Sequence, residues 1–150
     1  MTTSHPFPYD FTGRVAVITG GARGFGLEFA RALAGFGATV VIADLDAASG
    51  ERAAAALRET GAAARFAPLD VGIAAEHTAV ADLAASLGKL DIWINNAGIA
   101  RHAASETLTP EGWSRPLDIM LSGTFFGAQA AAQKMLAAGS GNIINIASVN

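Results

Sequence analysis

A glycine-rich segment, Thr19–Gly26, has the sequence Thr-Gly-Gly-Ala-Arg-Gly-Phe-Gly and the spacing of a phosphate-binding turn. Gly20 lets the backbone turn tightly, Gly24 lets a pyrophosphate approach backbone N–H groups, and Gly26 lets a helix pack closely on a strand. The alternative is a glycine turn with only a structural role, because glycines are common between strands and helices. The position of the segment after a predicted strand and before a predicted helix favours dinucleotide binding.

Asp44 lies 18 residues after Gly26, near the distance of about 20 residues at which dinucleotide-binding folds place an acid on the adenosine ribose. Capping of the following helix is the alternative role, and Asp46 can fill it instead. A carboxylate at the ribose repels the additional phosphate of NADP, so Asp44 predicts NAD as the preferred cofactor. Arg23 favours NADP, because a basic residue in this turn can pair with that phosphate.

Alternating strands and helices must bring these residues to one edge of a sheet. Short runs rich in β-branched residues predict buried strands, and apolar residues at helical spacing predict helices. Arg65 and Pro68 indicate that the third strand lies at an edge. Strands are predicted over Arg14–Thr19, Thr39–Ala43, Ala64–Leu69, Leu90–Asn95 and Asn142–Ala147, and helices over Phe25–Phe36, Ala74–Leu87, Glu111–Ala137 and the segment from an Asp46 cap to Glu59. This alternation predicts a doubly wound parallel α/β sheet of the Rossmann type with five strands.

Composition excludes several classes of protein. The chain has 150 residues, a net charge of −3 and no cysteine, which argues against a nucleic-acid surface and rules out disulfides and thiolate metal sites. No stretch reaches the about 18 apolar residues of a membrane span, and the start does not resemble a secretory signal, so a cytoplasmic protein is predicted. Residues 1–12 are predicted to be an N-terminal arm and residues 13–150 one dinucleotide-binding domain, incomplete at its C-terminal end.

The three histidines, His5, His77 and His102, share no ligand spacing, and no metal site is predicted. His77 falls within a predicted helix and is expected on its surface. His102 lies in a loop that could line a substrate pocket.

Four ordered motifs together resemble the classical short-chain dehydrogenase/reductase family. They are Thr19–Gly26, Asp70-Val71, Asn95-Asn96-Ala97-Gly98 and Asn145-Ile146-Ala147-Ser148, and the resemblance runs from about Gly13 to Asn150. It implies that Asp70 accepts from the adenine amino group, that Asn96, Ala97 and Gly98 leave room for ribose and nicotinamide, and that Ser148 binds the substrate oxygen. The expected cofactor-binding residues are Gly20, Arg23, Gly24, Phe25, Gly26, Asp44, Leu45, Asp70, Val71, Asn96, Ala97 and Gly98.

The resemblance implies an oxidoreductase that interconverts a secondary alcohol, such as a polyol or sugar-like compound, and a ketone by hydride transfer. Two departures affect this expectation. Met120 occupies the position of the family's catalytic Asn, and the Tyr-x-x-x-Lys motif is absent, since the only tyrosine is Tyr9 in the arm. These 150 residues alone are therefore expected to be inactive. The alternatives are a non-catalytic nucleotide-binding module and an S-adenosylmethionine-dependent methyltransferase. A helix of this family also forms a dimer face, so a homo-oligomer is expected if the chain is longer.

Overall fold

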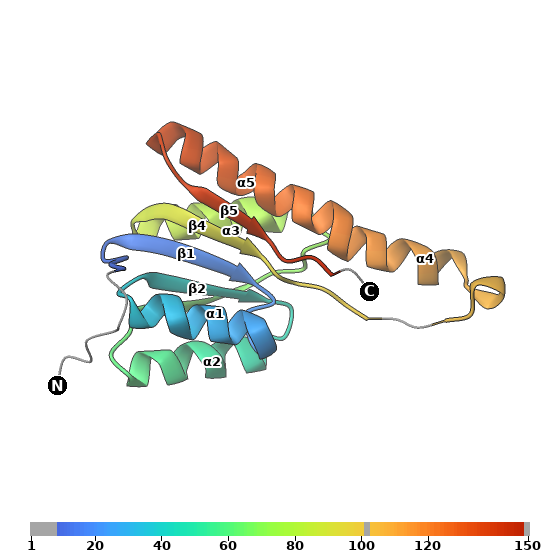
Figure 1. Cartoon of the computed structure of the whole chain (residues 1–150), viewed down its shortest axis with the longest axis horizontal. Helices are drawn as coiled ribbons and strands as arrows, with labels where there is room; N and C mark the ends of the chain where they lie inside the picture. Colours follow the sequence, from blue (N-terminus) through green and yellow to red (C-terminus); the bar gives the residue numbers. More distant parts are fainter. Residues whose placement is uncertain (1–8, 101–102, 149–150) are drawn as a thin grey trace.

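Five parallel strands form the centre of the molecule in the order β3-β2-β1-β4-β5 (Figure 1). The computed structural model describes residues 9–100 and 103–148. The strands are β1 (Arg14–Thr19), β2 (Thr39–Asp44), β3 (Ala64–Pro68), β4 (Lys89–Asn95) and β5 (Asn142–Asn145). The helices are α1 (Gly24–Gly35), α2 (Ala47–Glu59), α3 (Ala74–Leu87), α4 (Pro110–Leu117) and α5 (Gly123–Ala138), with a 3₁₀ turn η1 (Ser105–Thr107) and a π turn η2 (Asp118–Ser122). The predicted Rossmann-type sheet is confirmed.

Helices cover both faces of the sheet, which explains why its central strands are apolar at nearly every position. Successive side chains of β1 point to opposite faces, so Val15 and Val17 join one buried cluster while Ala16 and Ile18 join the other. The first cluster lies under α3 and α5, and the second lies under α1 and α2 (Figure 1). The two clusters hold the strand ends in fixed positions relative to the helices that follow them.

The element boundaries agree with the sequence predictions to within one residue except near the C-terminal end. β3 lies at an edge as predicted, and the Asp46 carboxylate accepts from the Ser49 N–H at 3.0 Å as a helix cap. The last strand is shorter than predicted, because its partner β4 ends at Asn95 and the pairing stops at Asn145. The helix predicted over Glu111–Ala137 is interrupted by the π turn. Pro116, which lacks a backbone N–H, lies two residues before that turn.

The order of the strands reverses between β1 and β4. The chain first moves outward through β2 and β3 and then returns to the other side of β1. The connections that leave β1 and β4 therefore diverge, and a crevice opens at their carboxyl ends, where open α/β sheets bind ligands. Within residues 9–100 and 103–148, no helix combines the length and the apolar character needed to cross a membrane.

His77 is fully buried, so the prediction that it lies on the surface is wrong. Its Nε2 lies 2.9 Å from the Val71 carbonyl oxygen, and its ring packs against Trp93 and Phe126. The alanine-rich helix α3 gives little contrast between its faces, and the aromatic rings that cover His77 come from distant segments. Burial lowers the pKa of His77, and the hydrogen bond to Val71 opposes this effect only in part.

The buried histidine is expected to make the fold sensitive to acid. A lowered folded-state pKa means that protons bind the unfolded chain first, so stability is complete above the unfolded value of about 6.5 and decreases as the pH falls below it. We expect the free energy of unfolding to decrease between pH 7.5 and pH 5.5 through this group, by at most about 1.4 kcal/mol, the limit for one group with an unfolded-state pKa of about 6.5. Denaturant titrations of the parent protein and His77→Gln at both pH values measure it. An equal pH dependence in the two proteins would contradict the assignment.

Candidate functional site

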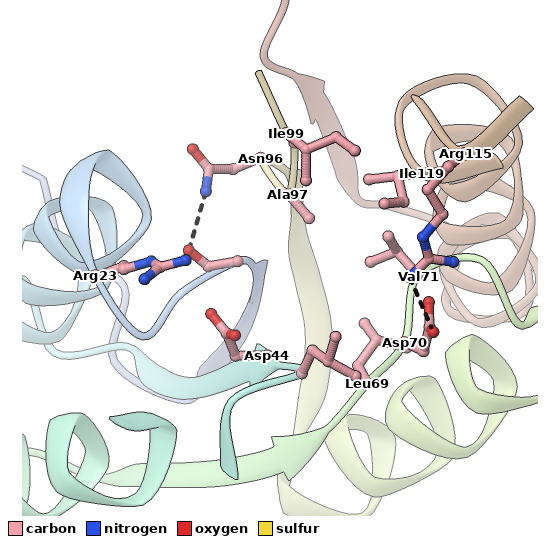
Figure 2. A pocket seen from close by; sticks show the side chains of 13 residues that line it. Arg23, Asp44, Leu69, Asp70, Val71, Asn96, Ala97, Ile99, Arg115 and Ile119 are labelled. Atoms are coloured by element: carbon pink, nitrogen blue, oxygen red, sulfur yellow. Dashed lines mark hydrogen bonds and ion pairs between the residues drawn. The ribbon is translucent and has the colours of Figure 1, made fainter. Parts of the chain in front are cut away.

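A cavity of about 310 Å³ lies at the carboxyl ends of β1, β2, β3 and β4, at the point where the strand order reverses (Figure 2). Nine of the twelve expected cofactor-binding residues line it: Gly20, Arg23, Asp44, Leu45, Asp70, Val71, Asn96, Ala97 and Gly98. They come from four separate segments of the chain. Two basic and two acidic side chains lie among the lining residues, so the cavity has no strong net charge.

The glycine turn has the backbone geometry that its sequence predicts. Gly20 and Gly24 have φ values of +63° and +56°, a region that residues with a Cβ rarely adopt. Gly26 has ordinary dihedral angles but no free space, because a Cβ built there would lie 2.2 Å from the Gly20 carbonyl oxygen and 2.6 Å from Asn96 Nδ2. By contrast, no other atom lies within 4 Å of a Cβ built on Gly24. The turn is therefore closely packed at Gly26, whereas the space beside Gly24 is open.

The start of α1 presents backbone N–H groups at this turn. Arg23 is the N-cap residue of α1, has extended dihedral angles and makes no side-chain cap hydrogen bond. The first N–H groups of a helix have no partner within the helix, and together with the helix dipole they attract anions. The open space at Gly24 and the uncapped start of α1 together fit a phosphate group.

Thr19 and Asn96 join the glycine turn to the end of β4. The Asn96 Nδ2 donates to the carbonyl oxygens of Thr19 and Gly20 at 3.0 and 3.2 Å. The Thr19 Oγ1 accepts from the backbone N–H groups of Asn96 and Ala97 at 3.0 and 3.1 Å. Asn96 therefore has the structural role of holding backbone groups of the crevice while it also lines the cavity (Figure 2).

Asp44 is held in place by backbone donors. Its Oδ2 accepts from the Ala22 N–H and its Oδ1 accepts from the Asp46 N–H, both at 3.0 Å. Asp44 is not the cap of α2, because Asp46 has that role. A carboxylate oxygen has more than one acceptor site, so both oxygens can still accept from a diol in the cavity. Arg23 lies on the same side of the cavity (Figure 2).

Asp70 lies on the other side of the cavity and pairs with a residue that sequence reasoning missed. Arg115 Nη2, from α4, lies 3.6 Å from Asp70 Oδ2, and Figure 2 shows the two side chains facing each other. Ile119, from η2, lines the same side. No sequence signal identified these two residues, because their contact depends on how α4 and η2 lie across the sheet. Leu69 and Ile99 complete the lining residues that were not predicted.

Five predicted residues lie outside the set that lines the cavity. Gly24 and Gly26 act through the backbone of the turn, and the Phe25 side chain is exposed and stacks on Phe29. Ser148 is exposed and follows β5. Met120 lies in the π turn, where its sulfur would be 3.8 Å from a Cβ built on Gly98. His102 lies outside the described residues, and no cluster that could hold a metal occurs among the residues described.

A larger cavity of about 680 Å³ lies against α1 at the opposite ends of β4 and β5. Its main polar group is the buried carboxylate of Asp91, which pairs with Arg14 at 2.6 Å and Lys89 at 3.2 Å. Burial opposes ionisation of Asp91, but the hydrogen bonds from Lys89 and Arg14 outweigh it and lower its pKa. These ion pairs already satisfy the carboxylate, so the smaller cavity is the better candidate for binding.

The chain is similar to several known proteins. The short chain dehydrogenase family description matches residues 14–150. D-threitol dehydrogenase of Mycolicibacterium smegmatis is 43% identical over 143 residues, which are 95% of this chain and 55% of the relative. A gluconate 5-dehydrogenase from Burkholderia cenocepacia, solved with NADP and tartrate, has a TM-score of 0.86 and 42% identity over 93% of this chain and 55% of that one. A short chain dehydrogenase/reductase from Burkholderia phymatum, solved with NAD, has a TM-score of 0.90 and 33% identity over 94% of this chain and 51% of that one. The chain spans about half the length of these proteins.

Proposed function

Because the chain belongs to the short-chain dehydrogenase family, we propose that the cavity at the β1–β4 switch point binds NAD and that the protein oxidises or reduces a small secondary alcohol or ketone. The observation that carries this proposal is the pair formed by the open glycine turn at the start of α1 and the fixed carboxylate of Asp44. The turn fits a pyrophosphate, and the carboxylate fits the two hydroxyl groups of a ribose.

In the proposed complex, different portions of the cofactor contact different sides of the cavity. Asp44 binds the adenosine ribose, Asp70 accepts from the adenine amino group, and Val71 packs against the base. Asn96, Ala97 and Gly98 leave space for the second ribose and the nicotinamide. NAD, when bound, supplies the hydride acceptor or donor, and the residues of this chain bind and orient it.

We propose a polyol or sugar-like compound as the substrate. The support comes from two similar proteins, one named a D-threitol dehydrogenase and the other a gluconate 5-dehydrogenase. Substrates of this kind carry a secondary hydroxyl group, which Ser148 would bind at the end of β5. No described residue identifies one compound among the polyols.

The residues with which the family transfers the proton are not found in these 150 residues. The Tyr-x-x-x-Lys motif does not occur among them, so we propose that the 150 residues alone bind cofactor without turnover. Met120 has no amide at the position of the family's Asn, and its thioether is at best a weak acceptor. The irregular turn at this position forms without the Asn, since the π turn contains Met120 and its carbonyl oxygen accepts from the Thr124 hydroxyl at 2.8 Å.

We also propose that the helical segment from α4 to α5 associates with a second copy of the protein. Four large apolar side chains recur there every four residues and are exposed: Trp113, Leu117, Leu121 and Phe125. Exposed apolar patches of this kind mark interaction surfaces. The resemblance to the family supports the same expectation.

Cofactor binding is tested by calorimetric titration with NAD and, in parallel, with S-adenosylmethionine. The two ligands share an adenosine, but S-adenosylmethionine has no pyrophosphate to place at the glycine turn. We expect saturable binding of NAD and binding of S-adenosylmethionine that is at least about tenfold weaker, a difference of about 1.4 kcal/mol. Equal affinity for both ligands, or tighter binding of S-adenosylmethionine, would contradict the proposed function and favour the methyltransferase alternative.

A further inference from the structure

Arg115 is the one cation that reaches the Asp70 carboxylate among the ion pairs of the described residues. It projects from α4, whereas Asp70 follows β3, so the pair joins two distant segments across one end of the cavity (Figure 2). The Arg115 side chain is 39% exposed and that of Asp70 is 23% exposed. The pair is therefore partly screened by water but lies at the surface that a bound ligand would cover.

The remaining hydrogen bonds of Asp70 fix its backbone and one of its carboxylate oxygens. The Asp70 N–H donates to Glu76 Oε2 at 2.6 Å, and Asp70 Oδ1 accepts from the Gly72 N–H at 2.9 Å. Oδ2 faces Arg115 at 3.6 Å, which is an ion-pair distance but longer than a hydrogen bond. Oδ2 thus keeps acceptor sites for a ligand while the nearby cation holds the carboxylate in position.

Both terminal nitrogens of Arg115 are directed toward the Asp70–Gly72 turn. Nη2 faces the carboxylate, and Nη1 would lie 3.8 Å from a Cβ built on Gly72. In this orientation the guanidinium interacts mainly with Asp70, and a base in the cavity is only a secondary partner.

We propose that Arg115 is a positioning residue that sets the choice of purine base by holding Asp70 as a hydrogen-bond acceptor. This inference rests on the proposed function, in which Asp70 meets the 6-position of the base. A 6-amino group donates to the fixed carboxylate, whereas a 6-oxo group places a second acceptor against it, and an unpaired buried polar group disfavours the wrong ligand. Adenine is therefore preferred to hypoxanthine, and the preference depends on Arg115.

A direct contact between Arg115 and the base predicts the opposite change in base preference. If the guanidinium instead donated directly to the base, it would bind a 6-oxo group, and its removal would increase the preference for adenine. The change in base preference on substitution of Arg115 therefore separates the two roles.

The experiment compares NAD with nicotinamide hypoxanthine dinucleotide, in which an oxo group replaces the 6-amino group of the base and N1 carries a hydrogen. Dissociation constants are measured by calorimetry for the parent protein, Arg115→Gln and Arg115→Lys. Partly exposed ion pairs contribute at most about 1 kcal/mol, so we expect Arg115→Gln to lower the preference for NAD about three- to fivefold. Arg115→Lys, which keeps the positive charge, is expected to retain most of the preference.

Arg31→Gln is the matched control, because it removes the same charge from an exposed ion pair with Glu28 on α1, outside the cavity. Its base preference is expected to equal that of the parent. An unchanged or increased preference for NAD in Arg115→Gln would overturn the inference while the proposed function stands. Failure of the unsubstituted protein to bind either dinucleotide would overturn the proposed function, and this inference with it.

Discussion

Replacing Gly26 with alanine is expected to raise the dissociation constant for NAD at least about tenfold, a loss of about 1.4 kcal/mol or more. The added Cβ would lie 2.2 Å from the Gly20 carbonyl oxygen. Because backbone cannot move aside as a flexible side chain does, the glycine turn must shift away from α1. Overpacking of this kind costs about 1–3 kcal/mol of stability, and the shift displaces the N–H groups that would face the pyrophosphate. Calorimetry with NAD and denaturant titration measure the two effects.

Two further glycine variants separate this clash from a general effect of the substitution. Gly112→Ala adds the same methyl group to α4, where the nearest atom is the end of the flexible Leu108 side chain at 3.0 Å. We expect its affinity for NAD to match that of the parent. Gly24→Ala adds a Cβ that meets no other atom within 4 Å, but the φ at this position is +56°. We therefore expect backbone strain without a steric clash in this variant. Parent-like affinity in Gly26→Ala would show that close packing behind the turn is not needed for binding.

NAD is expected to bind at least about tenfold more tightly than NADP, and Asp44→Ala is expected to remove most of this preference. The 2′-phosphate of NADP carries a charge of about −1.5 to −2 and would lie beside a carboxylate that two backbone N–H groups hold in place. Hydrogen bonds to a charged group contribute about 1.5–3 kcal/mol. Asp44→Ala should therefore weaken NAD binding about tenfold or more, while NADP loses less. Parallel titrations with both dinucleotides measure the ratio.

The ratio matters more than either affinity, because the loss of Asp44 also frees the Ala22 and Asp46 N–H groups and weakens both dinucleotides alike. Arg23→Ala is the complementary variant and should increase the preference for NAD, since Arg23 is the cation that can pair with a 2′-phosphate. Equal affinity of the parent for NAD and NADP, or an unchanged ratio in Asp44→Ala, would contradict the role of Asp44.

The positions of the strands could be predicted because local patterns determine them. The β-branched runs of β1 and β2 identify buried strands, and the glycines and prolines between elements mark their ends. The π turn at Asp118–Ser122 could not be predicted, since it depends on how the segment after Pro116 packs over Val71: a Cβ built on Gly123 would lie 2.8 Å from the Val71 carbonyl oxygen. The burial of His77 depends in the same way on Trp93 and Phe126.

The candidate site was predictable where it is built from residues at strand ends. Asp44, Asp70 and Asn96 each follow a strand or end one, so parallel pairing brings them to one edge of the sheet whatever the details of packing. Arg115 and Ile119 line the same cavity from a helix and a turn. Their positions depend on the angle at which α4 and η2 cross the sheet. The hydrophobic periodicity of the sequence does not determine that angle.

A crystal structure of the protein with NAD tests the central claim most directly. The account predicts electron density for the pyrophosphate at the Gly20–Gly26 turn, for the adenosine ribose at Asp44, and for adenine between Asp70 and Ile119. Density for the dinucleotide in the larger cavity beside Asp91, or at any place that leaves the glycine turn without a phosphate, would contradict it.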